Sequence, residues 1–128
     1  MAFLLVVDDD ADVLDLLDWH CRERGHAVAV ASSCEKALTW LRVARPPRLI
    51  LLDFFLPKMD GACFVELLRA GESTRAIPVI IMSAASPDWV ARRLVPDPLV
   101  RVVCKPFDFA SLDRMIEESM SASGAEGD

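Results

Sequence analysis

Five residues with ionisable or hydroxyl side chains each follow an apolar stretch of the sequence. They are Asp8, Asp9, Asp53, Ser83 and Lys105. A charged group beside so much apolar surface needs an opposite charge, a cation or contact with water. Two carboxylates about 4 Å apart repel by roughly 4 kcal/mol at an effective dielectric constant near 20, so three carboxylates that meet require a cation or a shared proton. Ligands that are all oxygen favour a hard cation such as Mg²⁺.

The apolar stretches are predicted to be strands of one sheet. The residues from Leu49 to Leu52 are aliphatic without alternation, which is typical of a strand buried on both faces, and Asp53 stands at its carboxyl end. Ligands bind at that end of open α/β sheets, so we interpret Asp53 as a functional residue. Four further strands are predicted over residues 2–7, 26–31, 77–82 and 99–104.

Apolar residues at helical spacing fill the segments between the predicted strands. The first helix is expected to stop at Gly25, and the second to begin at a capping box of Ser32 and Glu35 and to stop near Pro46. The remaining helices are expected to end near residue 71, to span about residues 87–95, and to carry apolar residues from 112 to 120. Strands that alternate with helices predict an α/β fold, a parallel sheet with helices on both faces.

Size and composition fit a single domain that binds other proteins. With 128 residues, 53% of them hydrophobic, the chain can form one core. Its net charge of -6 argues against binding to nucleic acid or to an anionic membrane, because both favour a basic face. No stretch is apolar enough to span a membrane and the start lacks signal-peptide features, so we expect a cytoplasmic location. Three of the four cysteines fall on predicted helices among apolar residues, which indicates buried, reduced thiols.

The five residues and their flanking segments resemble the receiver domain of two-component response regulators. The matching stretches are LVVDD (5–9), LLD (51–53), LPKMDG (56–61), PVIIMSA (78–84) and KPF (105–107). The resemblance implies a flavodoxin-like, doubly wound parallel sheet of five strands in the order 2-1-3-4-5, with five helices. We therefore expect a receiver domain over residues 1–120 and a flexible C-terminal tail over residues 121–128.

The resemblance also implies a role for each site residue. Asp53 would accept a phosphoryl group from a phosphohistidine of a histidine kinase or a histidine phosphotransfer domain. The Mg²⁺ ligands would be Asp9 directly, Asp8 mostly through water, Asp53, and the backbone carbonyl of Phe55. The phosphoryl oxygens would be contacted by Ser83 and Lys105. Phosphoryl transfer needs positioning and charge neutralisation, which these groups supply. The domain would be a regulatory switch for a downstream protein rather than an enzyme.

Several alternatives remain open on the sequence alone. The run from Asp8 to Asp10 could cap the first helix and complement its dipole. The chain could also be a receiver fragment of a longer regulator with an output domain, or a structural interaction module that is not phosphorylated. A hydrolase that forms an aspartyl-phosphate would need a second Asp two residues after the nucleophile, where this chain has Phe55.

Two features depart from the receiver pattern. Receivers commonly carry Tyr or Phe three residues before the lysine, where this chain has Val102. We therefore expect an atypical output surface around the fourth helix and the fifth strand, with Trp89 as a candidate contact. The positions two residues beyond Asp53 and Ser83 hold Phe55 and Ala85. Neither side chain can hydrogen-bond an attacking water, so we expect slow loss of the phosphoryl group.

Overall fold

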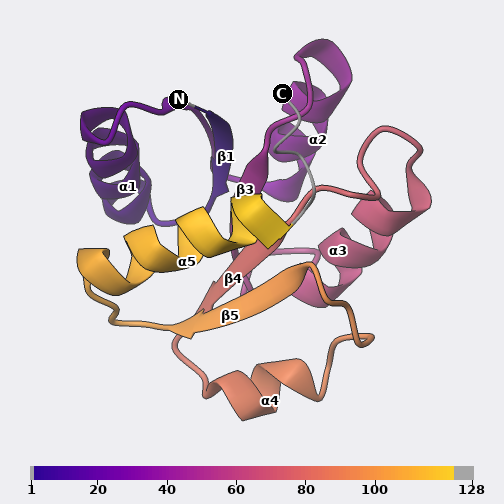
Figure 1. Ribbon diagram of the computed structural model, residues 1–128. Coiled ribbons are helices and arrows are strands. Elements are labelled where there is room, and N and C mark those ends of the chain that lie inside the picture. Colours follow the sequence, from indigo (N-terminus) through magenta and orange to yellow (C-terminus); the bar gives the residue numbers. More distant parts are fainter. Residues whose placement is uncertain (1, 123–128) are drawn as a thin grey trace.

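The computed structural model describes residues 2–122, in which five parallel strands form one sheet (Figure 1). The strands lie in the order β2-β1-β3-β4-β5, which confirms the predicted doubly wound sheet. Every adjacent pair is parallel, so all five carboxyl ends lie at one edge. The strands are β1 (Phe3–Val7), β2 (Ala27–Ala31), β3 (Leu49–Asp53), β4 (Val79–Ser83) and β5 (Val100–Cys104).

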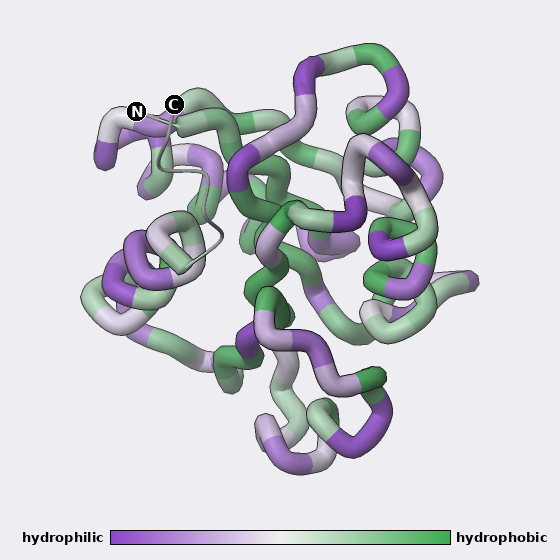
Figure 2. Tube along the Cα trace, turned by 45° about the vertical axis from the view of Figure 1, so that its right-hand side comes forward, coloured by the Kyte–Doolittle hydropathy of each residue, from purple (hydrophilic) through white to green (hydrophobic). Residues whose placement is uncertain are grey.

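Helices cover both faces of the sheet, as predicted. Helices α1 and α5 supply Leu17 and Ile116 to one buried cluster, and α2, α3 and α4 supply Ala37, Phe64 and Val90 to a second cluster on the opposite face. Figure 2 shows the hydrophobic segments gathered in the middle of the molecule, between more hydrophilic outer helices. The helices are α1 (Ala11–Glu23), α2 (Cys34–Val43), α3 (Gly61–Ala70), α4 (Pro87–Ala91) and α5 (Phe109–Ala122).

The central strand β3 and its neighbour β4 are buried over their whole length. Helices lie above and below them, so side chains that point to either face enter a core and alternation is lost. This explains the continuous aliphatic runs of the sequence. Because nothing within these strands can move without disturbing both cores, their carboxyl ends form a rigid base for the residues that follow.

Each of the five helices within residues 2–122 follows a side chain that accepts a hydrogen bond from a free backbone N–H group: Asp10, Ser33, Asp60, Ser86 and Asp108. The predicted capping box of Ser32 and Glu35 is wrong by one residue. Ser33 has an extended backbone (φ -154°) and its hydroxyl accepts from the N–H of Lys36 at 3.1 Å. The Ser32 hydroxyl instead accepts from the Lys36 ammonium at 3.0 Å.

Some predicted boundaries also shift. Strand β4 begins at Val79 rather than Ile77, because Pro78 has no N–H to donate to the ladder. Helix α4 ends at Ala91, short of the expected two turns. Helix α5 runs to Ala122, so the first two residues of the predicted tail are helical, and residues 123–128 lie outside the described part of the chain.

The cysteines only partly follow expectation. Cys21 and Cys34 are buried free thiols, whereas Cys63 and Cys104 are exposed. The prediction for Cys63 is wrong because α3 turns Phe64 and Leu68 toward the sheet and leaves Cys63 on its outer side. Across residues 2–122, no helix combines the length and the apolar character that crossing a membrane requires.

Candidate functional site

The ends of four strands bring the five predicted residues to one edge of the sheet. Asp8 and Asp9 follow β1, Asp53 ends β3, Ser83 ends β4 and Lys105 follows β5. Parallel register aligns Asp53 with Met82 and Ser83 with Cys104, so these chain ends lie side by side. One carboxylate oxygen from each of Asp8, Asp9 and Asp53 lies within 4.8 Å of the others. The convergence expected from the sequence is therefore present.

Lys105 supplies the positive charge closest to this acidic cluster. Its ammonium lies 2.9 Å from Oδ2 of Asp8 and 3.5 Å from Oδ1 of Asp53. The Lys105 backbone N–H donates to the Ser83 carbonyl at 2.7 Å, and a cis peptide bond joins Lys105 to Pro106. This hydrogen bond extends the pairing of β5 with β4 by one residue. The Lys105 side chain therefore begins at the carboxyl edge of the sheet and extends from β5 toward Asp53 and Asp8.

The acidic residues differ in exposure. Asp8 is fully buried, Asp53 is 6% exposed and Asp9 is exposed. Asp8 accepts a hydrogen bond from the N–H of Asp10 at 2.9 Å, which turns the chain immediately after β1. Asp10, rather than Asp8 or Asp9, caps α1. The alternative that this acidic run only caps the helix therefore applies to Asp10 alone.

The environment of Asp53 disfavours its charged form. Burial raises the pKa of Asp53 to about 6, and the neighbouring charge of Asp8 acts in the same direction, against the opposing effects of Lys105 and of a hydrogen bond from the Phe55 backbone. Burial by itself lowers the pKa of Lys105, but its hydrogen bond to Asp8 and the charge of Asp53 leave that pKa above its usual value. A single ammonium thus does not neutralise three carboxylates, and the edge favours a further cation.

The loop from β3 to α3 is held close to the site by its backbone. The Gly61 N–H donates to the Phe54 carbonyl at 2.7 Å, and a Cβ on Gly61 would lie 3.1 Å from the Phe54 Cα. Only glycine allows this approach without displacing the loop. Lys58 has a φ of 71°, a left-handed conformation that is unusual for a residue other than glycine. The backbone carbonyl of Phe55, the expected metal ligand, belongs to this loop.

Ser83 is fully buried, and its hydroxyl accepts a hydrogen bond from the Ala85 N–H at 3.0 Å. The hydroxyl is therefore tied to the loop between β4 and α4. Val102 aligns with Ile81 in the sheet and belongs to the partly buried margin of the core. The position that commonly carries an aromatic ring in receivers is thus an aliphatic packing position here.

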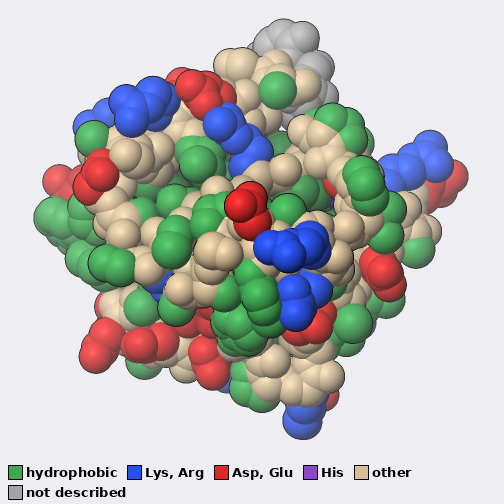
Figure 3. Space-filling view, turned by 90° about the horizontal axis from the view of Figure 1, so that it is seen from below, with side chains coloured by type: hydrophobic (Ala, Val, Ile, Leu, Met, Phe, Trp, Pro, Cys, Tyr) green, Lys and Arg blue, Asp and Glu red, His purple; other side chains and the backbone are tan. Residues whose placement is uncertain are grey.

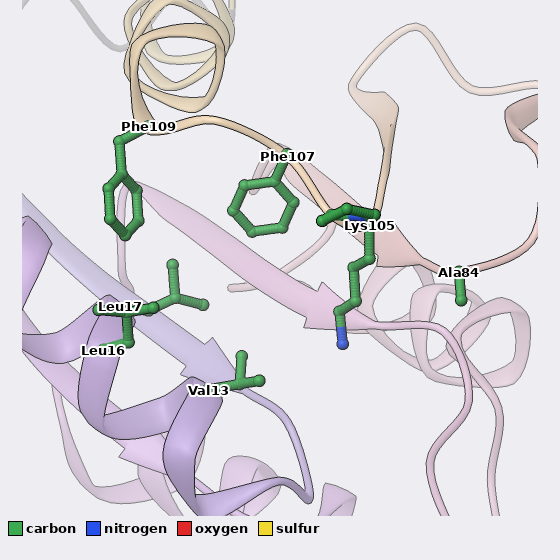
Figure 4. Close-up of a pocket in the computed structure, with 8 residues that line it drawn as sticks. Val13, Leu16, Leu17, Ala84, Lys105, Phe107 and Phe109 are labelled. Atoms are coloured by element: carbon green, nitrogen blue, oxygen red, sulfur yellow. The ribbon is translucent and has the colours of Figure 1, made fainter.

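A groove of about 530 Å³ adjoins the site, and the sequence analysis did not anticipate it. Figure 4 shows Leu16 and Leu17 of α1 on one side of it, Phe107 and Phe109 on the other, and Lys105 in its lining. Through its ammonium group Lys105 also contacts the acidic cluster. Leu16 is 51% exposed. Leu16 and Trp19 both lie outside the buried stripe of α1, and these two positions were the sequence signal for an apolar outer surface on this helix.

Fold and edge together define a doubly wound α/β domain with an acidic pocket beside a lysine. The response regulator receiver domain family matches residues 4–117, so this chain belongs to that family, the receiver domains of two-component response regulators. The family match includes all five strands, apart from Phe3 at the start of β1, and the residues at their carboxyl ends.

Individual relatives agree with this assignment. The chain is 38% identical over 88 residues to the transcriptional regulatory protein AfsQ1 of Streptomyces coelicolor, a match that covers 69% of this chain and 37% of AfsQ1. It is similar in structure to the signal receiver domain of a histidine kinase from Syntrophus aciditrophicus (TM-score 0.84, 25% identity, 98% of this chain and 94% of that one). NtrX from Brucella abortus is also similar (TM-score 0.83, 26% identity, 98% and 28%). The chain spans less than half the length of the first curated relatives that it matches.

Proposed function

We propose that this receiver accepts a phosphoryl group on Asp53 from the phosphohistidine of a histidine kinase or a histidine phosphotransfer domain. One observation carries the proposal: the Asp53 carboxylate lies among two further carboxylates and 3.5 Å from the Lys105 ammonium. A carboxylate in this setting can act as a nucleophile, and the neighbouring ammonium can neutralise negative charge on the transferred phosphoryl group.

In the proposed transfer an Asp53 oxygen attacks the phosphorus atom of the donor. The new bond joins that oxygen to phosphorus, the phosphorus–nitrogen bond of phosphohistidine breaks, and the electron pair leaves with the imidazole. The product is an acyl phosphate on Asp53. Lys105 would stabilise the charge on the transferred oxygens, and the Ser83 hydroxyl would exchange its bond with Ala85 for one to the phosphoryl group. This exchange would move the loop that leads into α4.

The acidic pocket suits Mg²⁺. All donors in the cluster are carboxylate oxygens, which hard cations prefer, and their excess negative charge remains after pairing with Lys105. Asp8, Asp9, Asp53 and the carbonyl of Phe55 would hold the ion. When bound, Mg²⁺ would neutralise charge on the phosphoryl oxygens during transfer.

The groove between α1 and residues 105–109 is the surface that we assign to the phosphodonor. Lys105 lines both this groove and the acidic edge, so a protein that covers Leu16 and Phe107 would bring its histidine close to Asp53. An exposed apolar patch bordered by polar groups is typical of protein–protein contacts. The output remains a switched contact with a downstream protein, and the domain acts as a regulator rather than as an enzyme on other substrates.

Whether the chain acts alone or within a longer regulator is a separate question. AfsQ1 is more than twice as long as its matched part, so an output domain is one arrangement that relatives use. A stand-alone relay is the other arrangement that the receiver unit supports. The cytoplasmic location stays a prediction.

The proposal is tested by incubating the purified chain with acetyl phosphate and Mg²⁺ and measuring its intact mass. We expect one added phosphoryl group, little addition when EDTA removes the metal, and none in Asp53→Asn. Asp15→Asn is a matched control, because it removes the same charge from an exposed position on α1. A parent protein that gains no mass would instead favour the unphosphorylated interaction module, and a gain that persists in Asp53→Asn would exclude Asp53 as the acceptor.

A further inference from the structure

An aromatic cluster joins the phosphoacceptor loop to α4. Phe54 and Phe55 directly follow Asp53, and both rings contact the indole of Trp89, with centroids 5.8 and 5.6 Å apart. The two phenylalanine rings also contact each other at 5.0 Å, edge to face. Trp89 lies in the first turn of α4, far from Asp53 in sequence. The cluster therefore links two segments that the sheet alone does not connect.

Trp89 is held on several sides. Its backbone N–H donates to the Ser86 hydroxyl at 3.2 Å, and the Arg93 guanidinium lies over its ring, 3.4 Å from the centroid. Arg93 also donates to the Trp89 carbonyl at 2.8 Å. The neighbouring Val90 is fully buried and anchors α4 to the core. The indole is thus a fixed surface rather than a freely rotating side chain.

The cluster reaches the site through Phe55. The backbone of Phe55 donates the hydrogen bond to the Asp53 carboxylate that was described above, while its ring rests against Trp89 and stays 49% exposed. The Phe55 ring has two aromatic neighbours, the buried Phe54 ring at 5.0 Å and the Trp89 indole at 5.6 Å, and only the indole belongs to a different segment of the chain. Contact with Trp89 therefore restrains the peptide group that contacts the phosphoacceptor.

Helix α4 is short and lies apart from the other helices, so its contact with the phosphoacceptor loop depends on few side chains. Helix α4 has only five residues and stands apart from the other helices at the bottom of Figure 1. Figure 3, seen from that side, shows hydrophobic side chains directly beside basic ones. The β5 position that commonly carries an aromatic ring holds Val102, and the chain has no tyrosine. The aromatic connection to the site comes from α4 instead.

We propose that Trp89 is a positioning residue for phosphoryl transfer to Asp53, acting through Phe55, so that Asp53 and the Trp89 indole are coupled through this aromatic contact. The inference rests on the proposed function, since it concerns the same acceptor. If the indole restrains the acceptor loop through Phe55, a phosphoryl group on Asp53 is expected to shift that loop and so to change the surroundings of the indole.

The first test follows each tryptophan by fluorine NMR in protein that contains 5-fluorotryptophan. The three tryptophans give three resonances, which single Trp→Phe variants assign. After acetyl phosphate and Mg²⁺ are added, and intact mass shows that a phosphoryl group is present, the Trp89 resonance shifts. The Trp40 resonance, from α2, stays in place.

The second test compares phosphorylation rate constants at saturating acetyl phosphate and Mg²⁺. Trp89→Ala is expected to lower the rate constant about tenfold, because a displaced acceptor loses part of the advantage of positioning. Trp89→Phe keeps a ring against Phe55 and stays within about twofold of the parent. Trp19→Ala, which removes a 59% exposed indole from α1, is the matched control and leaves the rate unchanged. Trp89→Leu keeps the bulk without the ring and serves if Trp89→Ala does not fold.

The outcomes separate this inference from the proposed function. A parent protein that gains no phosphoryl mass overturns both. A phosphorylated protein whose Trp89 resonance does not shift overturns the inference alone. So does a folded Trp89→Ala or Trp89→Leu variant that is phosphorylated at the parental rate.

Discussion

The interior of the sheet and its carboxyl edge are built on opposite principles. Within β3 and β4 the side chains from Leu49 to Leu52 and from Val79 to Met82 are aliphatic or Met and fully buried. One residue further along, the same strands end in Asp53 and Ser83, which are also buried but polar. The interior buries apolar area, which stabilises the fold. The edge buries charge, which costs stability.

The difference shows how the site is maintained. The raised pKa of Asp53 means that the folded protein holds this carboxylate in an environment that disfavours its charge. The two cores on either side of the sheet supply the stability that tolerates this. A cation that binds at this edge offsets the charge of the carboxylates. Because it binds the folded state and not the unfolded chain, it raises the free energy of unfolding.

The largest effect is expected in the interior. Ile80→Ala removes a fully buried side chain from the centre of β4 and is expected to lower the free energy of unfolding by about 2–5 kcal/mol. Urea denaturation followed by circular dichroism measures it. Leu67→Ala, at a 45% exposed position on α3, is the control and should stay within about 0.5 kcal/mol of the parent. Equal losses in the two variants would show that the interior is not the main source of stability.

At the carboxyl edge, a substitution is expected to raise the free energy of unfolding rather than lower it. Asp53→Asn removes a charge that burial and Asp8 disfavour, so the variant is expected to be more stable than the parent at pH 7.5, by about 1–2 kcal/mol. The same urea titration measures the difference. A variant that is less stable than the parent at this pH would mean that the Lys105 contact outweighs the cost of burying the carboxylate.

The pH dependence of that gap follows from the raised pKa. Folded Asp53 binds its proton more tightly than unfolded Asp53, so its contribution to stability is complete below the unfolded pKa of 3.8 and is lost as the pH rises through about 6. The Asn variant has no such loss. The two proteins should therefore differ little near pH 4 and diverge toward pH 7. A gap that is constant over this range would contradict the raised pKa.

The same contrast explains what the sequence could and could not reveal. The interior produces long aliphatic runs, so β3 was predictable from them, and each polar residue at the end of a run marked the edge. The strand order followed only from the resemblance to receiver domains. The site residues were found because Asp53 interrupts such a run. What escaped prediction depends on contacts between distant segments or on single-residue geometry: the groove between Leu16 and Phe107, the cap at Ser33, and the outward turn of Cys63.

Metal binding at the carboxyl edge is expected to change the free energy of unfolding by less than the substitution in the interior does. Mg²⁺ at ten times its dissociation constant is expected to stabilise the parent by about 1.4 kcal/mol, because it binds the folded cluster and not the unfolded chain. EDTA should reverse the effect. Asp9→Asn should lose most of it, while Asp15→Asn, with the same change of charge on the outer surface of α1, should keep it. Stabilisation that is equal in both variants would indicate screening of net charge rather than a site.

The smallest effect concerns the buried hydroxyl at the edge. Ser83→Ala removes the acceptor of the Ala85 N–H, and its cost to the free energy of unfolding is expected to be about 0.5–1.5 kcal/mol, as for other single hydrogen bonds. Both side chains are fully buried, but Ser83→Ala removes a single oxygen atom, so the gap that it leaves is minor compared with that of Ile80→Ala. If the hydroxyl serves the conformational response to phosphorylation rather than folding, Ser83→Ala should still gain phosphoryl mass from acetyl phosphate, yet the Trp89 resonance should shift less than in the parent. If Ser83→Ala instead lowers the free energy of unfolding by several kcal/mol, Ser83 belongs to the stabilising interior of the sheet rather than to its functional edge.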